Sequence, residues 1–317
     1  MAKQYRYLFG PVPSRRFKRS LGVDLTPLKT CNFDCVFCQL GRTRRKTVLR
    51  NEYAPIDTVL KELKEWLATD GYADYITLSG SGEPTLHTKF GEVLTFLKKA
   101  AKPSVLLTNG SFLSDPHVRK DAALADIVKV SMSAWDQNSF ELINRPHQDI
   151  SFNKFVDGQK KFRKIFTGQM WMEVFLLFGI NSRPADVSKL AAIAKEINPD
   201  RIQLNTVARP PAEEFAAALP HDSMQTLCRL FDPPAEIIAD FDAPFSDSIQ
   251  ATEADILAML QRRPCTINQI ANSFNMHVNE VSKYLGKLIN SNTITIYTVH
   301  KNSEVYYSAI FHTQDKS

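Results

Sequence analysis

The chain has 317 residues, of which 44% are hydrophobic and 23% are charged, and its net charge is +5. This length predicts a large domain with a smaller appendage, and the near-average composition excludes a disordered or fibrous protein. The first residues, MAKQYRYLFG, contain no apolar run of signal-peptide length. No later window reaches the roughly 18 apolar residues of a membrane helix, so we expect a cytoplasmic protein with no membrane partner.

Short β-rich apolar runs alternate with amphipathic stretches along the first two thirds of the chain. We predict six parallel strands at Leu21–Leu25, Tyr75–Leu78, Ser104–Leu107, Ile127–Val130, Met172–Phe178 and Arg201–Leu204. The crossover helices that parallel strands require are predicted at Ile56–Ala68, Phe90–Ala100, Asn153–Ile165 and Pro184–Ile197. A closed barrel of this kind needs eight units. The pattern therefore predicts an α/β fold, a partial (βα)6 TIM-type barrel over residues 1–230.

The last part of the chain has a different pattern. A Pro-rich, acidic stretch at residues 231–250 is the expected linker. Three helices follow in the prediction, and the spacing of the last two is that of a helix-turn-helix joined by Asn275-Met276-His277. They lie at Thr252–Gln261, Thr266–Phe274 and Val278–Ile289, followed by strands Thr293–Val299 and Glu304–Ser308 with His300-Lys301-Asn302-Ser303 as the turn. We predict a C-terminal winged helix-turn-helix domain over residues 251–317.

Three cysteines follow the first predicted strand. Cys31, Cys35 and Cys38 have the spacing C-x3-C-x2-C, and three thiolates on one short loop can bind three irons of a [4Fe–4S] cluster while the fourth iron stays open. The alternative is a zinc ion, but a structural zinc needs a fourth ligand at short range, and no second Cys or His pair follows. Cys228 and Cys265 stand alone and are expected to be small core residues.

Positive charge is concentrated around these cysteines. Residues 1–50 contain twelve Lys and Arg against two Asp, a net charge of +10, so the remaining residues carry −5. Such a field favours a polyanionic substrate. The alternative is that these side chains only cover the surface or bind the carboxylate of a cofactor. Arg15 and Arg16, just before the first predicted strand, are candidate substrate or cluster-side contacts.

With the aromatic Phe37 directly before its last cysteine, the motif resembles the signature of the radical S-adenosylmethionine (SAM) superfamily. The resemblance implies a [4Fe–4S] cluster and SAM as cofactors, with the SAM methionine group chelating the open iron. One electron then cleaves SAM to methionine and a 5′-deoxyadenosyl radical that abstracts hydrogen from the substrate. The resemblance also implies an electron donor such as flavodoxin or ferredoxin.

The resemblance extends to the ends of the later strands. Gly80-Ser81-Gly82-Glu83 resembles the family's glycine-rich turn, whose glutamate binds the SAM ammonium; the alternative is a plain turn with a helix-capping glutamate. Other polar strand ends stand where the family binds the SAM carboxylate and ribose or the adenosine. These residues, which otherwise would only be polar strand ends facing solvent, are Asn109, Ser131 and Ser133 for the former and Asn181 and Asn205 for the latter.

A narrower resemblance covers residues 7 to about 210. Gly-Pro-Val-Pro-Ser-Arg-Arg, Cys-Gln-Leu-Gly-Arg-Thr and Leu-Ser-Gly-Ser-Gly-Glu-Pro-Thr-Leu are similar to wyosine-synthase-related Fe–S oxidoreductases. The 4-demethylwyosine synthases of this group rebuild a guanine of tRNA with a second cluster and a lysine that reacts with pyruvate. Here no cysteine precedes Cys31, so a second cluster has no ligands upstream.

Three functions remain open on the sequence. The first is radical SAM modification of RNA, tRNA-like, or of another polyanion, favoured by the basic first fifty residues. The second is modification of a peptide or protein that docks on the winged helix, because residues 251–317 carry only +1, with six Lys and Arg against five Asp and Glu. The third is a non-catalytic Fe–S redox sensor that binds DNA, which would leave Glu83 without a role.

Overall fold

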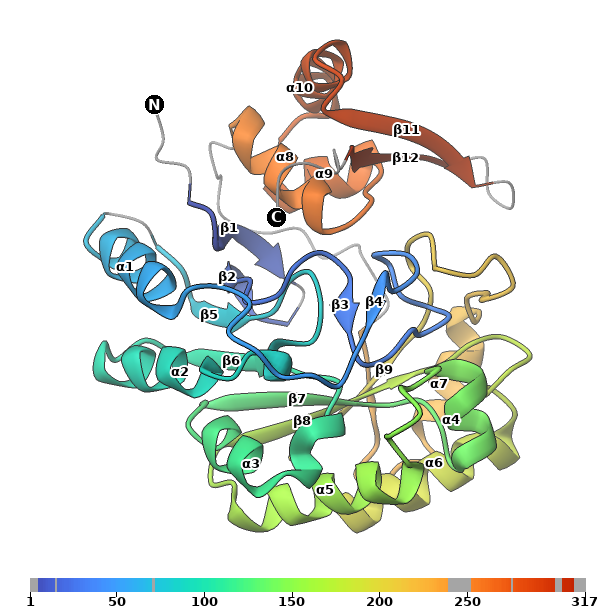
Figure 1. Ribbon diagram of the computed structural model, residues 1–317. Helices are drawn as coiled ribbons and strands as arrows, with labels where there is room; N and C mark the ends of the chain where they lie inside the picture. The colour runs from blue at the N-terminus through green and yellow to red at the C-terminus, as the bar shows by residue number, and fades with distance from the viewer. Residues whose placement is uncertain are drawn as a thin grey trace.

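The computed structural model describes residues 5–14, 16–69, 72–238, 252–274, 276–299 and 304–310. An open sheet of eight strands in the order β1-β2-β5-β6-β7-β8-β9-β10 forms its centre (Figure 1). The six predicted parallel strands are confirmed, and the fifth begins at Gln169 rather than Met172. They are β2 (Lys18–Val23), β5 (Tyr75–Leu78), β6 (Ser104–Leu107), β7 (Ile127–Met132), β8 (Gln169–Phe175) and β9 (Arg201–Asn205).

Two edge strands were not predicted. The strand β1 (Leu8–Ser14) pairs antiparallel with β2, and the short β10 (Glu236–Ile237) pairs parallel with β9. The segment predicted as a linker therefore begins as part of the main domain. It contributes β10 to the sheet, and its residues Phe231 and Ala235 are buried in the main core. The rest of that segment, residues 239–250, lies outside the described residues.

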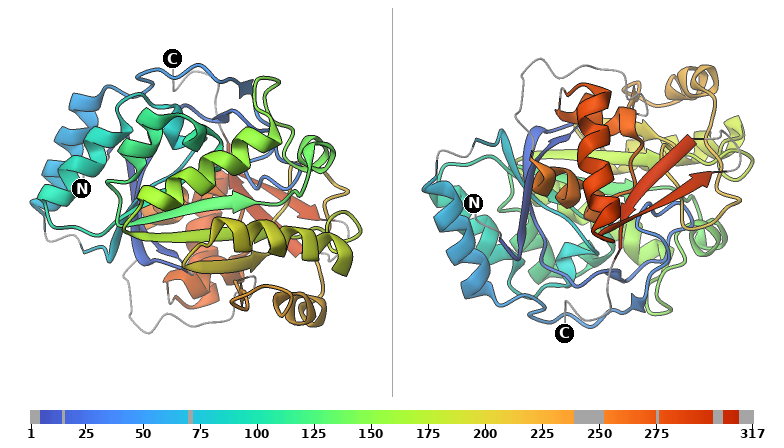
Figure 2. Two further views of the ribbon diagram at one scale, coloured as in Figure 1. Left: turned by 90° about the horizontal axis from the view of Figure 1, so that it is seen from below. Right: turned by 90° about the horizontal axis from the view of Figure 1, so that it is seen from above.

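Helices cover one face of this sheet (Figures 1 and 2). The four predicted crossover helices are α1 (Ile56–Leu67), α2 (Phe90–Lys99), α5 (Phe152–Ile165) and α6 (Pro184–Ile197). Shorter helices, which are too brief for a clear periodic signal, are α3 (Pro116–Ala122), α4 (Gln137–Ile143) and α7 (His221–Cys228), with single 3₁₀ turns at Pro84–Leu86 and Ser111–Ser114.

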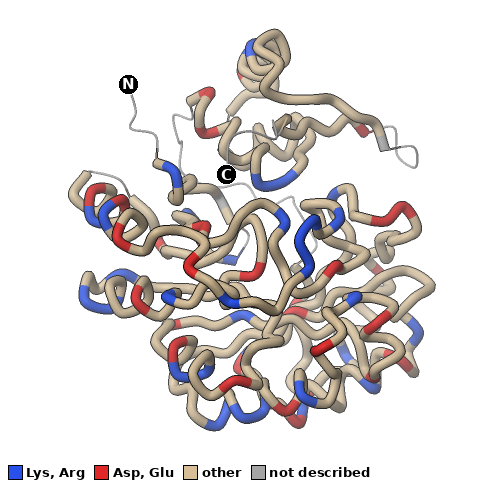
Figure 3. The backbone as a smooth tube through the Cα atoms, in the orientation of Figure 1, with Lys and Arg blue, Asp and Glu red and all other residues tan. Residues whose placement is uncertain are grey.

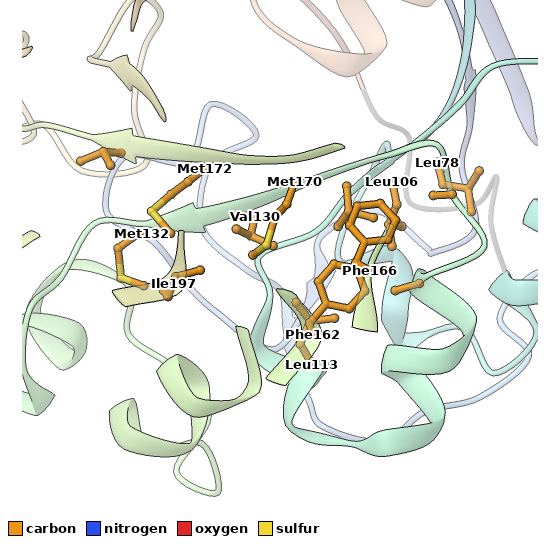
Figure 4. Packing of buried hydrophobic residues seen from close by; sticks show 14 of the residues in the cluster. Leu78, Leu106, Leu113, Val130, Met132, Phe162, Phe166, Met170, Met172 and Ile197 are labelled. Atoms are coloured by element: carbon orange, nitrogen blue, oxygen red, sulfur yellow. The ribbon is translucent and has the colours of Figure 1, made fainter. Parts of the chain in front are cut away.

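The main apolar core lies between these helices and the sheet. Val130 and Met170 from neighbouring strands pack toward Phe162 of α5 and the following Phe166, whose rings stack at 4.7 Å (Figure 4). Side chains alternate across a strand, so the residues in between point to the other face. Each strand therefore has an apolar side that faces the helices and an inner side that carries both apolar and polar residues.

The inner side of the sheet has two layers. An apolar base layer consists of Phe17, Val105, Ile127 and Trp171, in which Phe17 stacks on Trp171 at 5.2 Å. The next inward positions of β7 and β8, toward the carboxyl ends of the strands, are the buried Lys129 and Glu173. This polar layer covers the aromatic base and makes the inner side of the sheet hydrophilic.

The C-terminal unit, residues 252–310, has its own core around Ile256, Phe274 and Leu285. It consists of α8 (Glu253–Arg262), α9 (Ile267–Phe274), α10 (Val278–Asn290) and an antiparallel hairpin of β11 (Ile294–Val299) and β12 (Glu304–Ala309). Helices α8 and α9 contact β1 (Figure 1). The predicted turn at 300–303 and Asn275 lie outside the described residues. Within the described residues, no helix combines the length and the hydrophobicity of a membrane span.

Candidate active site

The cysteine loop follows β2 and is held in place by the end of α4. The amides of Asp34 and Val36 donate to the carbonyls of Asn144 and Ile143, both at 3.0 Å. Phe33 packs edge-on against Phe140 with ring centroids 5.2 Å apart. Cys31 lies in the short strand β3 (Thr30–Cys31), which pairs with β4 (Arg45–Lys46). These backbone and ring contacts hold the loop against α4 and β4.

Each of the three cysteine sulfurs accepts a hydrogen bond from a nitrogen of a neighbouring side chain. The distances are 3.8 Å from Asn109 Nδ2 to Cys31 Sγ, 3.3 Å from Asn144 Nδ2 to Cys35 Sγ and 3.2 Å from Lys29 Nζ to Cys38 Sγ. N–H donors of this kind stabilise thiolates and tune the reduction potential of a bound cluster. Asn144 and Lys29 therefore belong to the site together with the three cysteines.

The chemistry of the three thiols fits an iron–sulfur cluster. Burial raises the pKa of Cys31 to about 12 and raises that of Cys35 as well, so thiolates persist here only with compensating positive charge. Within the described ranges, no three His, Cys, Asp or Glu side chains converge as ligands of a single ion. In a cluster each thiolate binds its own iron, so the three sulfurs do not have to meet at one point.

Glu83 lies beside Cys31 and is only 2% exposed. Its Oε1 accepts from Thr85 N at 3.0 Å and Thr108 Oγ1 at 2.6 Å, and its Oε2 accepts from Asn109 N at 2.8 Å. Burial raises the pKa of this carboxyl against the effect of those hydrogen bonds. No Lys, Arg or His of the described chain pairs with it, so its charge lacks a cation that a ligand ammonium would supply.

The glycines beside Glu83 serve the protein's own packing. A Cβ at Gly80, whose φ is +151°, would lie 2.4 Å from Asp24 Cγ, and one at Gly82 would lie 1.8 Å from the Thr30 carbonyl oxygen. Ser81 donates to Asp24 Oδ2 at 2.5 Å. The nearest atoms to both positions belong to Asp24 and to the start of the cysteine loop. The two glycines bring the Glu83 turn against that loop.

Among the remaining predicted residues, some adjoin the cysteines and others do not. Phe37 stacks on Phe175 at 4.1 Å, and Asn109 contacts both Cys31 and Glu83, so these residues adjoin the cysteines. The side chain of Asn181 is occupied by the backbone, because its Nδ2 donates to the carbonyls of Ser133 and Phe175 at 2.8 and 2.9 Å.

Ser131 lies on β7 opposite Glu173, and the buried Ser133 Oγ has no hydrogen-bond partner in the described structure. Asn205 lines a cavity on the inner side of the sheet. Arg15 lies outside the described residues.

A cavity of about 400 Å³ occupies the inner side of the sheet and includes Cys38, Gly80 and Gly82 in its wall. Glu173 lies in the polar layer at its floor, where it accepts from Arg16 Nη1 and Asn205 Nδ2, both at 2.8 Å, and forms an ion pair with Lys129. Burial opposes ionisation of this carboxyl, but the charges of Lys129 and Arg16 hold its pKa well below the usual range.

We expect Glu173→Gln to lower the free energy of unfolding at pH 7 by about 3–5 kcal/mol, because Lys129 loses its buried partner. A lowered carboxyl pKa contributes stability that is present above the unfolded pKa and is lost as pH falls. The wild type should therefore lose stability between about pH 5 and pH 3 more steeply than the variant. Urea unfolding at several pH values measures this, with the exposed Glu141→Gln as control; parallel pH curves for wild type and Glu173→Gln would contradict it.

The C-terminal unit completes the wall of the cavity through Met259, Arg262 and Arg263. Arg262 forms an ion pair with the buried Asp24, and its Nη1 donates to Ser81 Oγ at 2.9 Å. Its guanidinium lies 4.1 Å from the centre of the Phe9 ring on β1. One side chain thus connects α8 to the turn that precedes Glu83.

The residues of this arrangement that were not among the predicted site residues include Asn144, Lys129, Asp24 and Arg262. Asp24 lay inside the predicted strand Leu21–Leu25, whereas in the structure it directly follows β2, which ends at Val23. The other three carry no local signal, because their partners are far away in sequence: Arg262 and Asp24 are separated by 238 positions.

Comparison with known proteins identifies the family of the chain. Residues 25–191 match the family model described as the radical SAM superfamily. The chain belongs to the radical SAM superfamily, and as a member it is an enzyme that uses a [4Fe–4S] cluster and SAM.

Among individual relatives, the chain is 30% identical over 324 residues to the UPF0026 protein MJ1312 of Methanocaldococcus jannaschii, with 98% of both chains covered. It is 39% identical over 293 residues to a protein named GTPase Obg from Brachyspira hyodysenteriae, covering 90% of this chain and 43% of that protein. The sequence has no G-x-x-x-x-G-K-[ST] loop for a nucleotide phosphate. The solved structure of TYW1 with a lysine–pyruvate adduct matches with a TM-score of 0.52 at 15% identity, covering 69% of this chain and 76% of that one. This match shows that the two proteins share a fold.

Proposed function

We propose that this enzyme reductively cleaves SAM at a [4Fe–4S] cluster bound by Cys31, Cys35 and Cys38. The observation that carries the proposal is the buried carboxylate of Glu83, which has no cationic partner among the described residues and adjoins Cys31 through Asn109. The cluster, when bound and reduced, supplies the electron that splits SAM into methionine and a 5′-deoxyadenosyl radical. The test is formation of 5′-deoxyadenosine from SAM by the reduced protein.

The chain's own residues would then bind and orient SAM. Glu83 is proposed to accept hydrogen bonds from the ammonium of the methionine group. Asn109, Ser131 and Ser133 are proposed to bind its carboxylate and the ribose. The Phe37 ring, held by its stack on Phe175, is proposed to pack against the adenine. Asn181 is proposed to support the binding residues indirectly, because its amide donates to the carbonyls of Ser133, after β7, and Phe175, at the end of β8.

The architecture proposed for this function is a partial (βα)6 barrel over residues 1–230 and a winged helix over residues 251–317. The open sheet with its hydrophilic inner side supports the first assignment. The order of three helices and an antiparallel hairpin, with a separate core, supports the second. A role as a redox sensor would use neither the cavity nor Glu83, so catalysis is the better explanation.

The substrate is proposed to be RNA or a similar polyanion, with flavodoxin or ferredoxin as the electron donor. Arg42, Arg44, Arg45 and Lys46 are all exposed and follow Cys38 within a few residues, and Lys and Arg gather on the segment that carries β4 (Figure 3). An exposed basic segment beside the cysteine loop is suited to phosphate contacts.

We expect the double variant Arg44→Gln/Arg45→Gln to bind RNA more weakly and with less dependence on salt. Loss of two phosphate contacts should reduce the slope of log K against log salt concentration by about 1.4. Fluorescence titration of a labelled tRNA measures both quantities. Lys98→Gln/Lys99→Gln, which removes two exposed charges at the end of α2, should leave the slope unchanged; an equal loss in both variants would refute a specific RNA surface.

A further inference from the structure

We propose that the cavity binds the substrate through an anionic group of phosphate or carboxylate type. This inference names the substrate class of the proposed function and rests on it. Among the described residues, the cavity lining contains one carboxylate, Glu173, and five cationic side chains: Arg16, Lys129, Arg209, Arg262 and Arg263. These side chains belong to the floor, to the segment after β9 and to the wall that α8 contributes.

At the floor, Glu173 is the one carboxylate of the described residues that pairs with Arg16. Glu173 also pairs with Lys129 and accepts from the Asn205 amide at 2.8 Å, so it neutralises Arg16 only in part. Because burial of an incompletely compensated charge is unfavourable, a ligand anion near Arg16 would be stabilised there.

The wall formed by α8 carries a second excess charge. Arg262 is neutralised by its ion pair with Asp24, whereas no carboxylate of the described chain pairs with the neighbouring Arg263. Arg209 extends toward the cavity from the segment after β9 and donates to Gln39 Oε1 at 3.3 Å. The C-terminal unit thus supplies a cation to the cavity as well as closing it.

SAM alone does not account for this charge. At neutral pH SAM carries a sulfonium and an ammonium against one carboxylate, a net charge of +1, and a cationic ligand gains nothing from a cationic cavity. The negative groups suited to its ammonium are Glu83 and the cluster thiolates at the rim. A second, anionic ligand would balance the remaining cations, and about 400 Å³ is within the range of small-molecule sites.

The test measures anion binding by calorimetry on the full-length, cluster-loaded protein, with inorganic phosphate, succinate and a 5′-mononucleotide as probes. We expect binding by the wild type and an increase of Kd by about 10- to 150-fold in Arg263→Gln, the range for a lost hydrogen bond to a charged group. Arg16→Gln should weaken binding similarly. Arg229→Gln, which removes an exposed arginine at the end of α7, should leave Kd unchanged.

Absence of binding by the wild type, or equal weakening by Arg229→Gln, overturns the inference. If Arg16→Gln does not fold, Arg263→Gln decides, because that side chain is partly exposed and has no described ion pair. Stronger binding of the mononucleotide assigns the anion to a nucleotide of RNA, and stronger binding of phosphate or succinate assigns it to a free small substrate. SAM cleavage without anion binding refutes this inference alone, whereas anion binding without SAM cleavage refutes the proposed function alone.

Discussion

Replacement of Cys38 by alanine should abolish both the cluster and SAM cleavage. A [4Fe–4S] cluster with three protein ligands cannot lose one of them and keep its geometry, so iron should fall well below about four atoms per chain. Formation of 5′-deoxyadenosine should fall by more than about 100-fold, since even the loss of residues that only support ligands costs 10–100-fold in metal affinity. Iron analysis, the visible absorption of the cluster and chromatography of the products measure these effects.

The matched control is Cys228→Ala. Cys228 ends α7 and donates to the carbonyl of Gln225 at 3.0 Å, so its loss should leave iron content and product unchanged. Iron loss in Cys228→Ala equal to that in Cys38→Ala would show that the cysteine loop is not the cluster site.

Glu83→Gln should bind SAM more weakly while the cluster stays intact. Gln keeps the shape of the side chain but removes the negative charge, and a hydrogen bond to a charged group contributes about 1.5–3 kcal/mol. The Kd for SAM should therefore rise by about 10- to 150-fold, with iron content equal to that of the wild type. Equilibrium dialysis with labelled SAM on the reconstituted, oxidised protein measures the affinity without catalysis.

Two results would give Glu83 a different role. If Glu83→Gln lowers the melting temperature and the iron content together, the carboxylate supports the turn between Gly82 and Thr85 rather than SAM. If the exposed Glu141→Gln weakens SAM binding to the same degree, the effect is one of overall charge.

The β/α alternation could be predicted because each strand is apolar on the helix side and because every crossover helix has an amphipathic period. The cysteine motif could be predicted because its spacing alone specifies three thiolates on one loop. The strand β10 was missed, since a two-residue strand inside a Pro-rich segment has no periodicity.

The electrostatic organisation of the cavity depends on contacts between distant residues. Lys129 and Glu173 are 44 positions apart, and each looks like an ordinary charged residue within a strand until the sheet brings them together. The role of Gly80 and Gly82 also depends on tertiary structure, because only the folded chain shows Asp24 and Thr30 against them. The sequence around Arg262 gives no sign of a role in the site, because its partner Asp24 lies in the other part of the chain.

The most direct measurement is the yield of 5′-deoxyadenosine from SAM by the anaerobically reconstituted protein with dithionite as reductant. We predict product in the wild type, strongly reduced product in Glu83→Gln with its cluster retained, and none in Cys38→Ala. A wild-type protein that carries a verified [4Fe–4S] cluster but neither binds nor cleaves SAM, with and without RNA, would show that Cys31, Cys35, Cys38 and Glu83 do not form a SAM-cleaving site.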